Sequence, residues 1–171
     1  MKGNPQLKKD HYVSYDGDEF GYRKWLPKSA AHQDPAIVII GVHGISGHAG
    51  DYDNLAHYLL KHRQDVALYA AETRGQGMDL KERRRGDIRR VEQWYQDLTT
   101  FTELVRQEHP QSKIVWFGES MGSLIVMHGY QNARREQRPH AMAISSPIIE
   151  VDSELPTWKL LAAKCAAILF P

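Results

Sequence analysis

With 171 residues, the chain is long enough for one domain with a substantial core, and its apolar fraction of 42% and charged fraction of 25% are ordinary for a globular protein. The 22 basic and 21 acidic side chains give a formal net charge of +1, which argues against nucleic acid as the main partner. The single cysteine, Cys165, offers neither an internal disulfide nor a cysteine metal cluster. Because no apolar signal segment follows the basic N-terminus, we expect a soluble, cytoplasmic protein.

Six segments of the sequence predict β-strands. The first two are rich in aromatic residues and flank the turn signal Asp16-Gly17-Asp18. The later ones are runs of apolar and β-branched residues, which are typical of strands buried on both faces of a sheet. The six strands are expected at residues 11–15, 19–26, 36–42, 66–71, 113–117 and 141–145.

Helices are expected between the later strands, where apolar residues recur at intervals of three and four. The first is a short amphipathic helix with Asp51 or Asp53 as its N-cap. One side of this helix is formed by Leu55, Tyr58, Leu59 and His62. The second helix carries its apolar stripe at Val91, Trp94, Leu98, Phe101 and Val105. Two more are expected at residues 120–137 and from about residue 157 to 170.

Strands that alternate with helices pair in parallel through crossover connections. The sequence therefore predicts an α/β protein, a three-layer sandwich with a mostly parallel sheet, and we assign residues 1–150 to this core. In such sheets the chemistry collects at the C-terminal ends of the strands. Three segments are expected at that edge, namely residues 43–45, 74–75 and 118–122.

The third of these segments, Gly118-Glu119-Ser120-Met121-Gly122, stands between a predicted strand and a predicted helix. In so tight a turn, side chains at the two glycine positions would collide with backbone, and the serine hydroxyl would project from a strained conformation. Gly-x-Ser-x-Gly alone occurs by chance in roughly one chain of this size in twenty. The plainer alternative is a turn with a capping serine. Because of the strand before it and the helix after it, we predict that Ser120 is a nucleophile.

A nucleophilic serine needs hydrogen-bond donors for the oxyanion that forms during acyl transfer. We expect these to be the backbone N–H groups of Met121 and of Ile45, which lies in the loop His43-Gly44-Ile45. His43 and His48 do not match any standard zinc spacing, so a structural hydrogen-bonding role is favoured for His43. The sequence implies no metal and no organic cofactor.

Residues 43–56, HGISGHAGDYDNLA, resemble the His-Gly-x-Gly-Glu-His region of the monoacylglycerol lipase and lysophospholipase branch of the α/β-hydrolase family, a branch of serine aminopeptidase type. Residues 73–77 (TRGQG) are similar to its Arg-Gly-His-Gly loop, and residues 85–87 and 94–98 to the segment that follows. The resemblance extends from about residue 11 to residue 147. It implies a carboxylic ester hydrolase that acts on an acyl ester or lipid.

On this resemblance Ser120 attacks the acyl carbonyl. Supporting roles fall to His43, Gly44, Gly118, Glu119 and Gly122. The sequence departs from the branch at several places: Ser46-Gly47 replaces Gly-Glu, Glu72 replaces Asp, Gln76 replaces His, and Met78 stands near an expected Ser. Glu119 stands where the branch often has His. These differences concern the substrate class more than the fold.

The acid and the base of a catalytic triad follow the serine in this fold. His128 lies two turns into the helix after Ser120 and His140 precedes the last strand, so neither is expected to reach the hydroxyl. The resemblance implies that both groups lie beyond residue 171, after a helical cap that begins at residues 151–171. We therefore expect a fragment that is inactive alone, because loss of the triad base costs on the order of a millionfold in rate.

Two alternatives remain. The chain could be a non-catalytic binding or assembly module whose sheet is completed by a partner chain. The apolar segment 158–170 would be a cap helix that contacts acyl chains or a membrane surface, or a helix covered by the missing half. Left uncovered, it would favour homo-oligomers. For the basic run at residues 81–90, a solvated face is favoured over a lipid-binding one.

Overall fold

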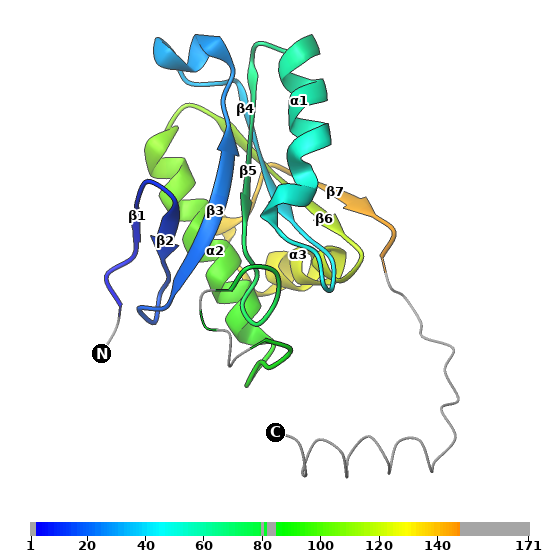
Figure 1. The fold of residues 1–171 in the computed structure, drawn as a ribbon. Coiled ribbons are helices and arrows are strands. Elements are labelled where there is room, and N and C mark those ends of the chain that lie inside the picture. The colour runs from blue at the N-terminus through cyan, green and yellow to red at the C-terminus, as the bar shows by residue number, and fades with distance from the viewer. Residues whose placement is uncertain (1–2, 80, 82–84, 148–171) are drawn as a thin grey trace.

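The computed structural model describes residues 3–79, 81 and 85–147. Seven strands form one sheet in the order β1-β2-β3-β5-β4-β6-β7 (Figure 1). Their bounds are β1 (Gln6–Leu7), β2 (His11–Val13), β3 (Glu19–Trp25), β4 (Ile37–Val42), β5 (Val66–Ala71), β6 (Lys113–Glu119) and β7 (Ala141–Ser145). The strands from β5 through β4 and β6 to β7 are parallel. The N-terminal pairs β1–β2, β2–β3 and β3–β5 are antiparallel. All six predicted strands are present; β1 was not predicted.

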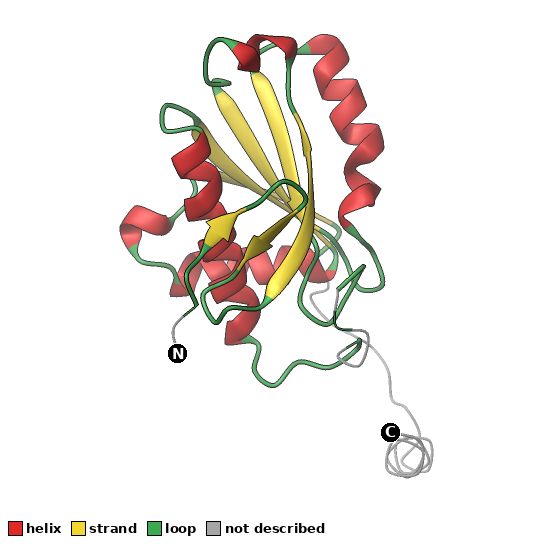
Figure 2. Cartoon of the chain, turned by 60° about the vertical axis from the view of Figure 1, so that its left-hand side comes forward, coloured by secondary structure: helices red, strands yellow, loops and turns green. Residues whose placement is uncertain are grey.

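Helices cover both faces of the sheet (Figure 2). They are α1 (Asp53–His62), α2 (Glu92–Glu108) and α3 (Met121–Asn132), with short 3-10 helices η1 (Lys28–Ala31), η2 (Ala49–Tyr52) and η4 (Arg135–Gln137). On one face α1 packs through Ala56 against β5, and on the other face α2 and α3 pack together over β4 and β6. The predicted three-layer α/β class is therefore confirmed.

Aromatic side chains hold the N-terminal strands against α2. The ring of Tyr12 lies 5.6 Å from that of Phe20 and 4.8 Å from that of Phe101, centroid to centroid. Trp116 of β6 is fully buried and donates its indole N–H to Thr102 Oγ1 at 2.8 Å. Burial of aromatic rings contributes much of the hydrophobic stabilisation of a core, and the indole N–H is satisfied as burial requires.

The predicted start and burial of α1 were wrong in detail. Its N-cap is Tyr52, without a side-chain cap bond, while Asp51 accepts the backbone N–H of His48 at 2.9 Å. Tyr58, expected on the buried side, is 63% exposed and packs its ring on His62. The fully buried residue of this helix is Ala56, and Leu55 and Leu59 of the predicted apolar side pack beside it against the same core cluster.

The helix expected at residues 120–137 ends earlier, at Asn132. Ala133 adopts an extended conformation, and Arg138 Nε donates to the carbonyl of Ala133 at 3.2 Å. The chain then forms η4 before β7. The helix expected near residues 157–170 and the cap at 151–171 lie outside the described residues.

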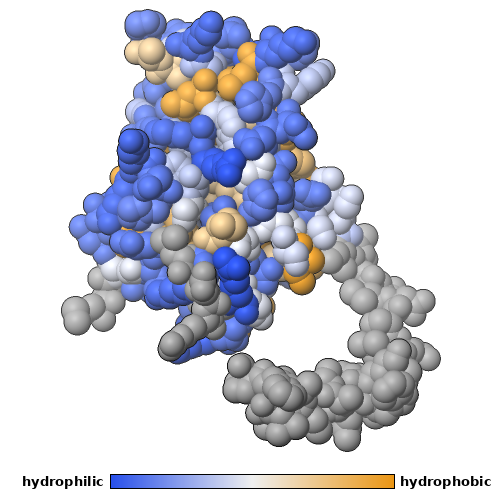
Figure 3. All heavy atoms as spheres, viewed as in Figure 1, coloured by the Kyte–Doolittle hydropathy of each residue, from blue (hydrophilic) through white to orange (hydrophobic). Residues whose placement is uncertain are grey.

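The surface seen in Figure 3 is predominantly hydrophilic, with apolar residues in small separate groups. No helix in the described part of the chain is both long and apolar enough to cross a membrane. The edge strand β7 is an exception to the burial of the other parallel strands: four of its five residues are exposed, including Met142 and Ile144.

Candidate active site

Ser120 occupies the sharp turn between β6 and α3. Its backbone has φ 51° and ψ −117°, a left-handed conformation that non-glycine residues rarely adopt. The two flanking glycines are required sterically. A Cβ at Gly122 would stand 1.9 Å from the carbonyl oxygen of Val42, and one at Gly118 would stand 2.5 Å from that of Gly122. The strained turn and the reason for its glycines are confirmed.

The loop after β4 lies directly against this turn, because β4 and β6 are neighbours with Val42 paired to Gly118. A Cβ built on Gly44 would stand 3.1 Å from Ser120 Cβ and 3.7 Å from Ser120 Oγ. The structure thus brings together two of the three segments expected at this edge of the sheet, residues 43–45 and 118–122.

His43 is fully buried and fixes the backbone of this loop. Its Nε2 accepts the backbone N–H of Thr73 at 3.1 Å, so in the neutral ring the proton is on Nδ1, which donates to the Gly44 carbonyl at 2.8 Å. In a planar trans peptide the C=O and the next N–H point in opposite directions. Holding the Gly44 carbonyl toward His43 therefore turns the N–H of Ile45 away from that ring. The hydrogen-bonding role expected for His43 is present.

The two predicted oxyanion donors belong to this arrangement. Met121 is the first residue of α3, where helix N–H groups lack intrahelical partners and the helix dipole is positive. Within the described chain, neither the Met121 nor the Ile45 backbone N–H donates a hydrogen bond, and Ser120 Oγ likewise has none. The Ile45 side chain is 64% exposed. The assignment of these groups as donors stays a prediction.

Two positions at which the sequence departs from the family motif connect the loops around Ser120. Glu72 is buried, and its two carboxylate oxygens accept the backbone N–H groups of Ala49 at 3.1 Å and Met78 at 2.9 Å. Gln76 Oε1 accepts the N–H of Ser46 at 3.2 Å. The loops after β4 and β5 are therefore joined by side chains, and neither contact was predicted from the sequence.

Ser123, one residue after the motif, is also part of the turn. Its buried hydroxyl lies 2.9 Å from the carbonyl oxygens of both Gly118 and Ser145. The carbonyl of Ser145 also accepts the backbone N–H of Ser120 at 2.9 Å. The C-terminal end of β7 is thus hydrogen-bonded to the turn that carries Ser120. A polar residue directly before the apolar stretch Leu124–Met127 of α3 was the available signal.

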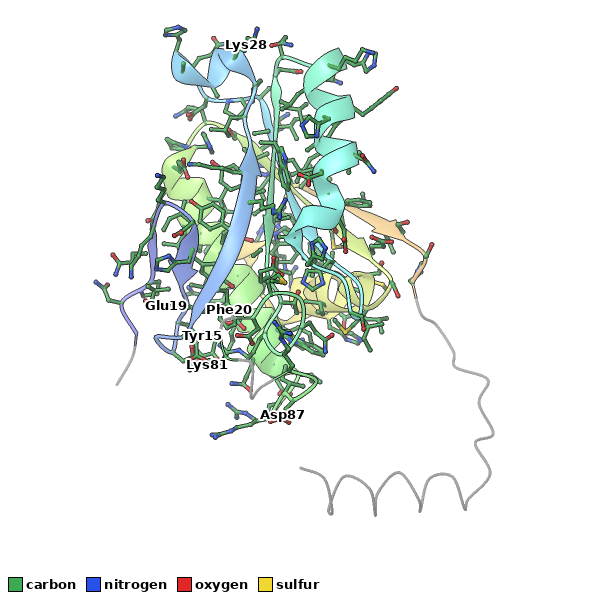
Figure 4. All side chains as sticks on the ribbon, in the orientation of Figure 1. Tyr15, Glu19, Phe20, Lys28, Lys81 and Asp87 are labelled. Carbon is green, nitrogen blue, oxygen red and sulfur yellow. The ribbon has the colours of Figure 1, made fainter. Side chains whose placement is uncertain are left out.

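Arg74, at the C-terminal edge of β5, has a structural role. Its guanidinium is buried and pairs with Asp97 on α2 at 2.7 Å, with Asp18 at 2.7 Å and with Asp16 at 3.0 Å. Burial alone lowers the pKa of Arg74, but the bonds from Asp97 and Asp16 outweigh it and raise that pKa. Figure 4 labels Tyr15, Phe20 and Lys81 at this end of the molecule; both rings contact the guanidinium.

All nine histidines lie in the described part of the chain, and none of them hydrogen-bonds Ser120 there. His128 stacks on Tyr95 with ring centroids 6.0 Å apart, and His140 Nδ1 accepts the N–H of Ile114 at 3.0 Å. The residues that the structure describes also hold no group of three or more His, Cys, Asp or Glu side chains suited to a metal ion.

A mixed sheet between helical layers, with a strained serine at the strand-to-helix turn and glycines on both sides, defines the α/β-hydrolase fold. More narrowly, residues 33–171 match the model of the Hydrolase_4 family, described as serine aminopeptidase, S33, and the chain belongs to that family. The resemblance noted in the sequence is thereby confirmed.

Among curated relatives, the chain is similar to a monoglyceride lipase of Rattus norvegicus, with 30% identity over 162 residues that cover 94% of this chain and 50% of the relative. It is also similar to a monoacylglycerol lipase of Mycolicibacterium smegmatis, with 26% identity over 94% of this chain and 54% of the relative. The chain therefore spans about half the length of these relatives.

Two solved structures show the same fold. One is a lipase in its open form, with a TM-score of 0.68, 21% identity and coverage of 94% of this chain and 51% of that chain. The other is a soluble variant of a Saccharomyces cerevisiae monoglyceride lipase in complex with a substrate analogue, with a TM-score of 0.63 and 17% identity over 100% of this chain and 54% of that one.

Proposed function

We propose that this chain is the nucleophile-bearing part of a carboxylic ester hydrolase that acts on monoacylglycerols or lysophospholipids. The observation that carries the proposal is the strained Ser120 with the backbone of Gly44 packed against its side chain. The relatives named as monoglyceride lipases support the substrate class.

In the proposed reaction Ser120 Oγ attacks the acyl carbonyl carbon, and the carbonyl oxygen takes up negative charge. The N–H groups of Ile45 and Met121 hold this oxyanion, and loss of one such donor typically costs about 3 kcal/mol of transition-state stabilisation. A histidine base would take the proton of the hydroxyl, oriented by a carboxylate. The alcohol part then leaves, and water hydrolyses the acyl-serine.

We propose that this base and this acid lie in a second half of the protein, which would correspond to the half of each relative that this chain does not match. The described residues offer Ser120 no histidine, and a serine without its base is a weak nucleophile. The 171-residue chain by itself is therefore expected to have no esterase turnover.

The test is labelling of the whole protein, this chain together with that second half, by a serine-reactive fluorophosphonate. Ser120→Ala should abolish labelling and hydrolysis of a monoacylglycerol. The control Ser29→Ala, on η1, should label like the wild type, because its hydroxyl bonds the carbonyl of Gln64 far from the turn. Turnover by the 171 residues alone that Ser120→Ala removes would overturn the placement of the base.

A second candidate, a non-catalytic module whose sheet is completed by a partner chain, is favoured by the exposed edge strand β7. Such an edge is a ready template for strand pairing. Whole protein that fails to label although an acid and a histidine are present would support this candidate. Labelling of Ser120 would exclude it as the main function.

A further inference from the structure

A pocket lies at the end of the sheet opposite Ser120. It encloses about 430 Å³ between α2, η4 and the N-terminal end of β7. Three arginines (Arg106, Arg135 and Arg138) line it, together with Tyr130, Glu136 and His140. Its volume falls within the range of small-molecule sites.

Arg106 lines this pocket, but its terminal guanidinium nitrogens are already hydrogen-bonded within the protein. It pairs with Glu103, and its two terminal nitrogens donate to the carbonyls of Glu136 and Arg138, both at 3.2 Å. Glu136, the acidic residue of the lining, has its carboxylate 3.4 Å from Arg134 Nε. The bonds from Arg106 attach η4 and the segment after it to α2.

Neither of the other two guanidinium groups, those of Arg135 and Arg138, forms an ion pair with a carboxylate among the described residues. Arg138 Nε donates to the Ala133 carbonyl, and its guanidinium stacks 4.7 Å from the centre of the Tyr130 ring. Its terminal nitrogens and the whole guanidinium of Arg135 have no hydrogen-bond or ion-pair partner among the described residues. Two guanidinium groups with unpaired donors therefore line the same pocket.

His140 supplies a third donor. Because its Nδ1 accepts the backbone N–H of Ile114, the neutral ring carries its proton on Nε2. A lining of two guanidinium groups without a carboxylate partner in the described chain, together with one imidazole N–H, presents donors to an anion with several oxygens. Arginine forks match phosphate geometry with paired hydrogen bonds.

We propose that this pocket binds the phosphate group of a soluble phosphomonoester. The dianion would lie between Arg135 and Arg138 and accept from His140, and the rest of the volume would hold the organic part. A phosphorylated lipid headgroup has the same chemistry, but the position argues against a membrane. The chain rises roughly 20 Å along β6 from Ile114 to Ser120, the residue that follows this strand, so a bilayer docked at the pocket would hold Ser120 at the far end of the sheet. The site is independent of the proposed ester hydrolysis.

The test is binding of glycerol 3-phosphate to the 171-residue chain, followed by calorimetry and by the phosphorus NMR signal. Saturable binding is expected, weakened about tenfold or more in Arg135→Gln, because a charge-assisted pair is lost. The matched control is Arg63→Gln, which removes the same charge from an exposed arginine paired to Asp65 and should bind like the wild type. Arg138→Gln also removes the hydrogen bond to the Ala133 carbonyl, so its effect on binding is interpreted only if its circular dichroism spectrum matches that of the wild type.

Vesicles with and without phosphatidic acid, a monoester lipid, form the second arm. Binding of glycerol 3-phosphate that is lost in Arg135→Gln and kept in Arg63→Gln supports the proposal. Binding to phosphatidic acid vesicles without binding of the soluble ester overturns the soluble source. Absence of saturable binding in both arms, or equal affinity of Arg135→Gln and wild type, overturns the site itself.

Discussion

The backbone of Gly44 lies so close to Ser120 that a Cβ at position 44 would stand 3.1 Å from the serine Cβ. This contact joins the end of β4 to the turn after β6, and a methyl group at position 44 would fit only if Ser120 shifted by a few tenths of an ångström. The carbonyl of Gly44 is at the same time fixed by His43. The peptide that would bind the oxyanion is therefore positioned from two sides.

Gly44→Ala should slow fluorophosphonate labelling of Ser120 in the whole protein by about 10- to 100-fold, because a small displacement of the reacting groups is costly. The added methyl group must push the serine or its loop aside. Gly21→Ala is the control, since a Cβ there meets Glu72 Cγ at an ordinary 3.5 Å. Wild-type labelling rates for Gly44→Ala would contradict the positioning.

Gly122→Ala should destabilise the fold by about 3 kcal/mol, because its Cβ would overlap the carbonyl oxygen of Val42. Gly129→Ala, on the same helix, meets only side-chain carbons at 3.4 and 3.6 Å. Alanine favours a helix by up to about 1 kcal/mol over glycine, so this control should be neutral or stabilising. Urea unfolding followed by circular dichroism measures both, and equal stabilities would count against the close contact.

Arg74→Met should lower the free energy of unfolding by about 3–5 kcal/mol, because it leaves the buried Asp97 without its counter-ion. The N-terminal strands should loosen first, since Asp16 and Asp18 attach there. Amide hydrogen exchange would show this as faster exchange in β2 and β3. In the control Arg63→Met, an exposed pair is broken and stability should stay close to that of the wild type.

Alkaline pH should unfold the protein in a way that its tyrosines explain. Burial raises the pKa of Tyr12, Tyr52 and Tyr69 above the ordinary value of about 10. Above pH 10 the unfolded chain loses phenol protons that the folded chain keeps, so stability is intact below pH 10 and falls as pH rises. Each such group contributes a slope of about 1.4 kcal/mol per pH unit.

Tyr52→Phe should reduce that slope, as urea unfolding at a series of pH values would measure. Ultraviolet absorbance gives an independent check, because the buried phenols should ionise together with unfolding rather than before it. Reversible ionisation of all tyrosines in the folded protein near pH 10 would be incompatible with their burial.

The sequence could predict features that depend on neighbours in the chain. The glycines around Ser120 are diagnostic because a strand-to-helix turn leaves no space for other residues at those positions. The apolar run at Val66–Ala71 became a strand with the predicted bounds, and its first five residues are buried, as expected for a strand inside a parallel sheet.

Features that depend on distant partners could not be read in this way. Arg74 gathers carboxylates from residues 16, 18 and 97, and no local pattern indicates their meeting. No glycine or proline marks the end of α3 at Asn132. The carbonyl of the next residue, Ala133, is instead bound by Arg138, a residue six positions beyond Asn132. Tyr58 fits the helical stripe that also carries Leu55 and Leu59, yet only the two leucines pack against the core cluster around Ala56 and Leu68, while Tyr58 is exposed.

The carbonyl of Ser145 accepts hydrogen bonds from both the Ser120 backbone and the Ser123 hydroxyl. Ser145 is the last residue of β7, which has a single strand neighbour, β6, among the described residues. A neighbour that docks on β7 and shifts it would thus move the turn at Ser120 through two hydrogen bonds, without touching it. Through the Ser145 carbonyl, the position of the sheet edge therefore affects the alignment of the serine. Covering that edge would change the reactivity of Ser120 from outside the site.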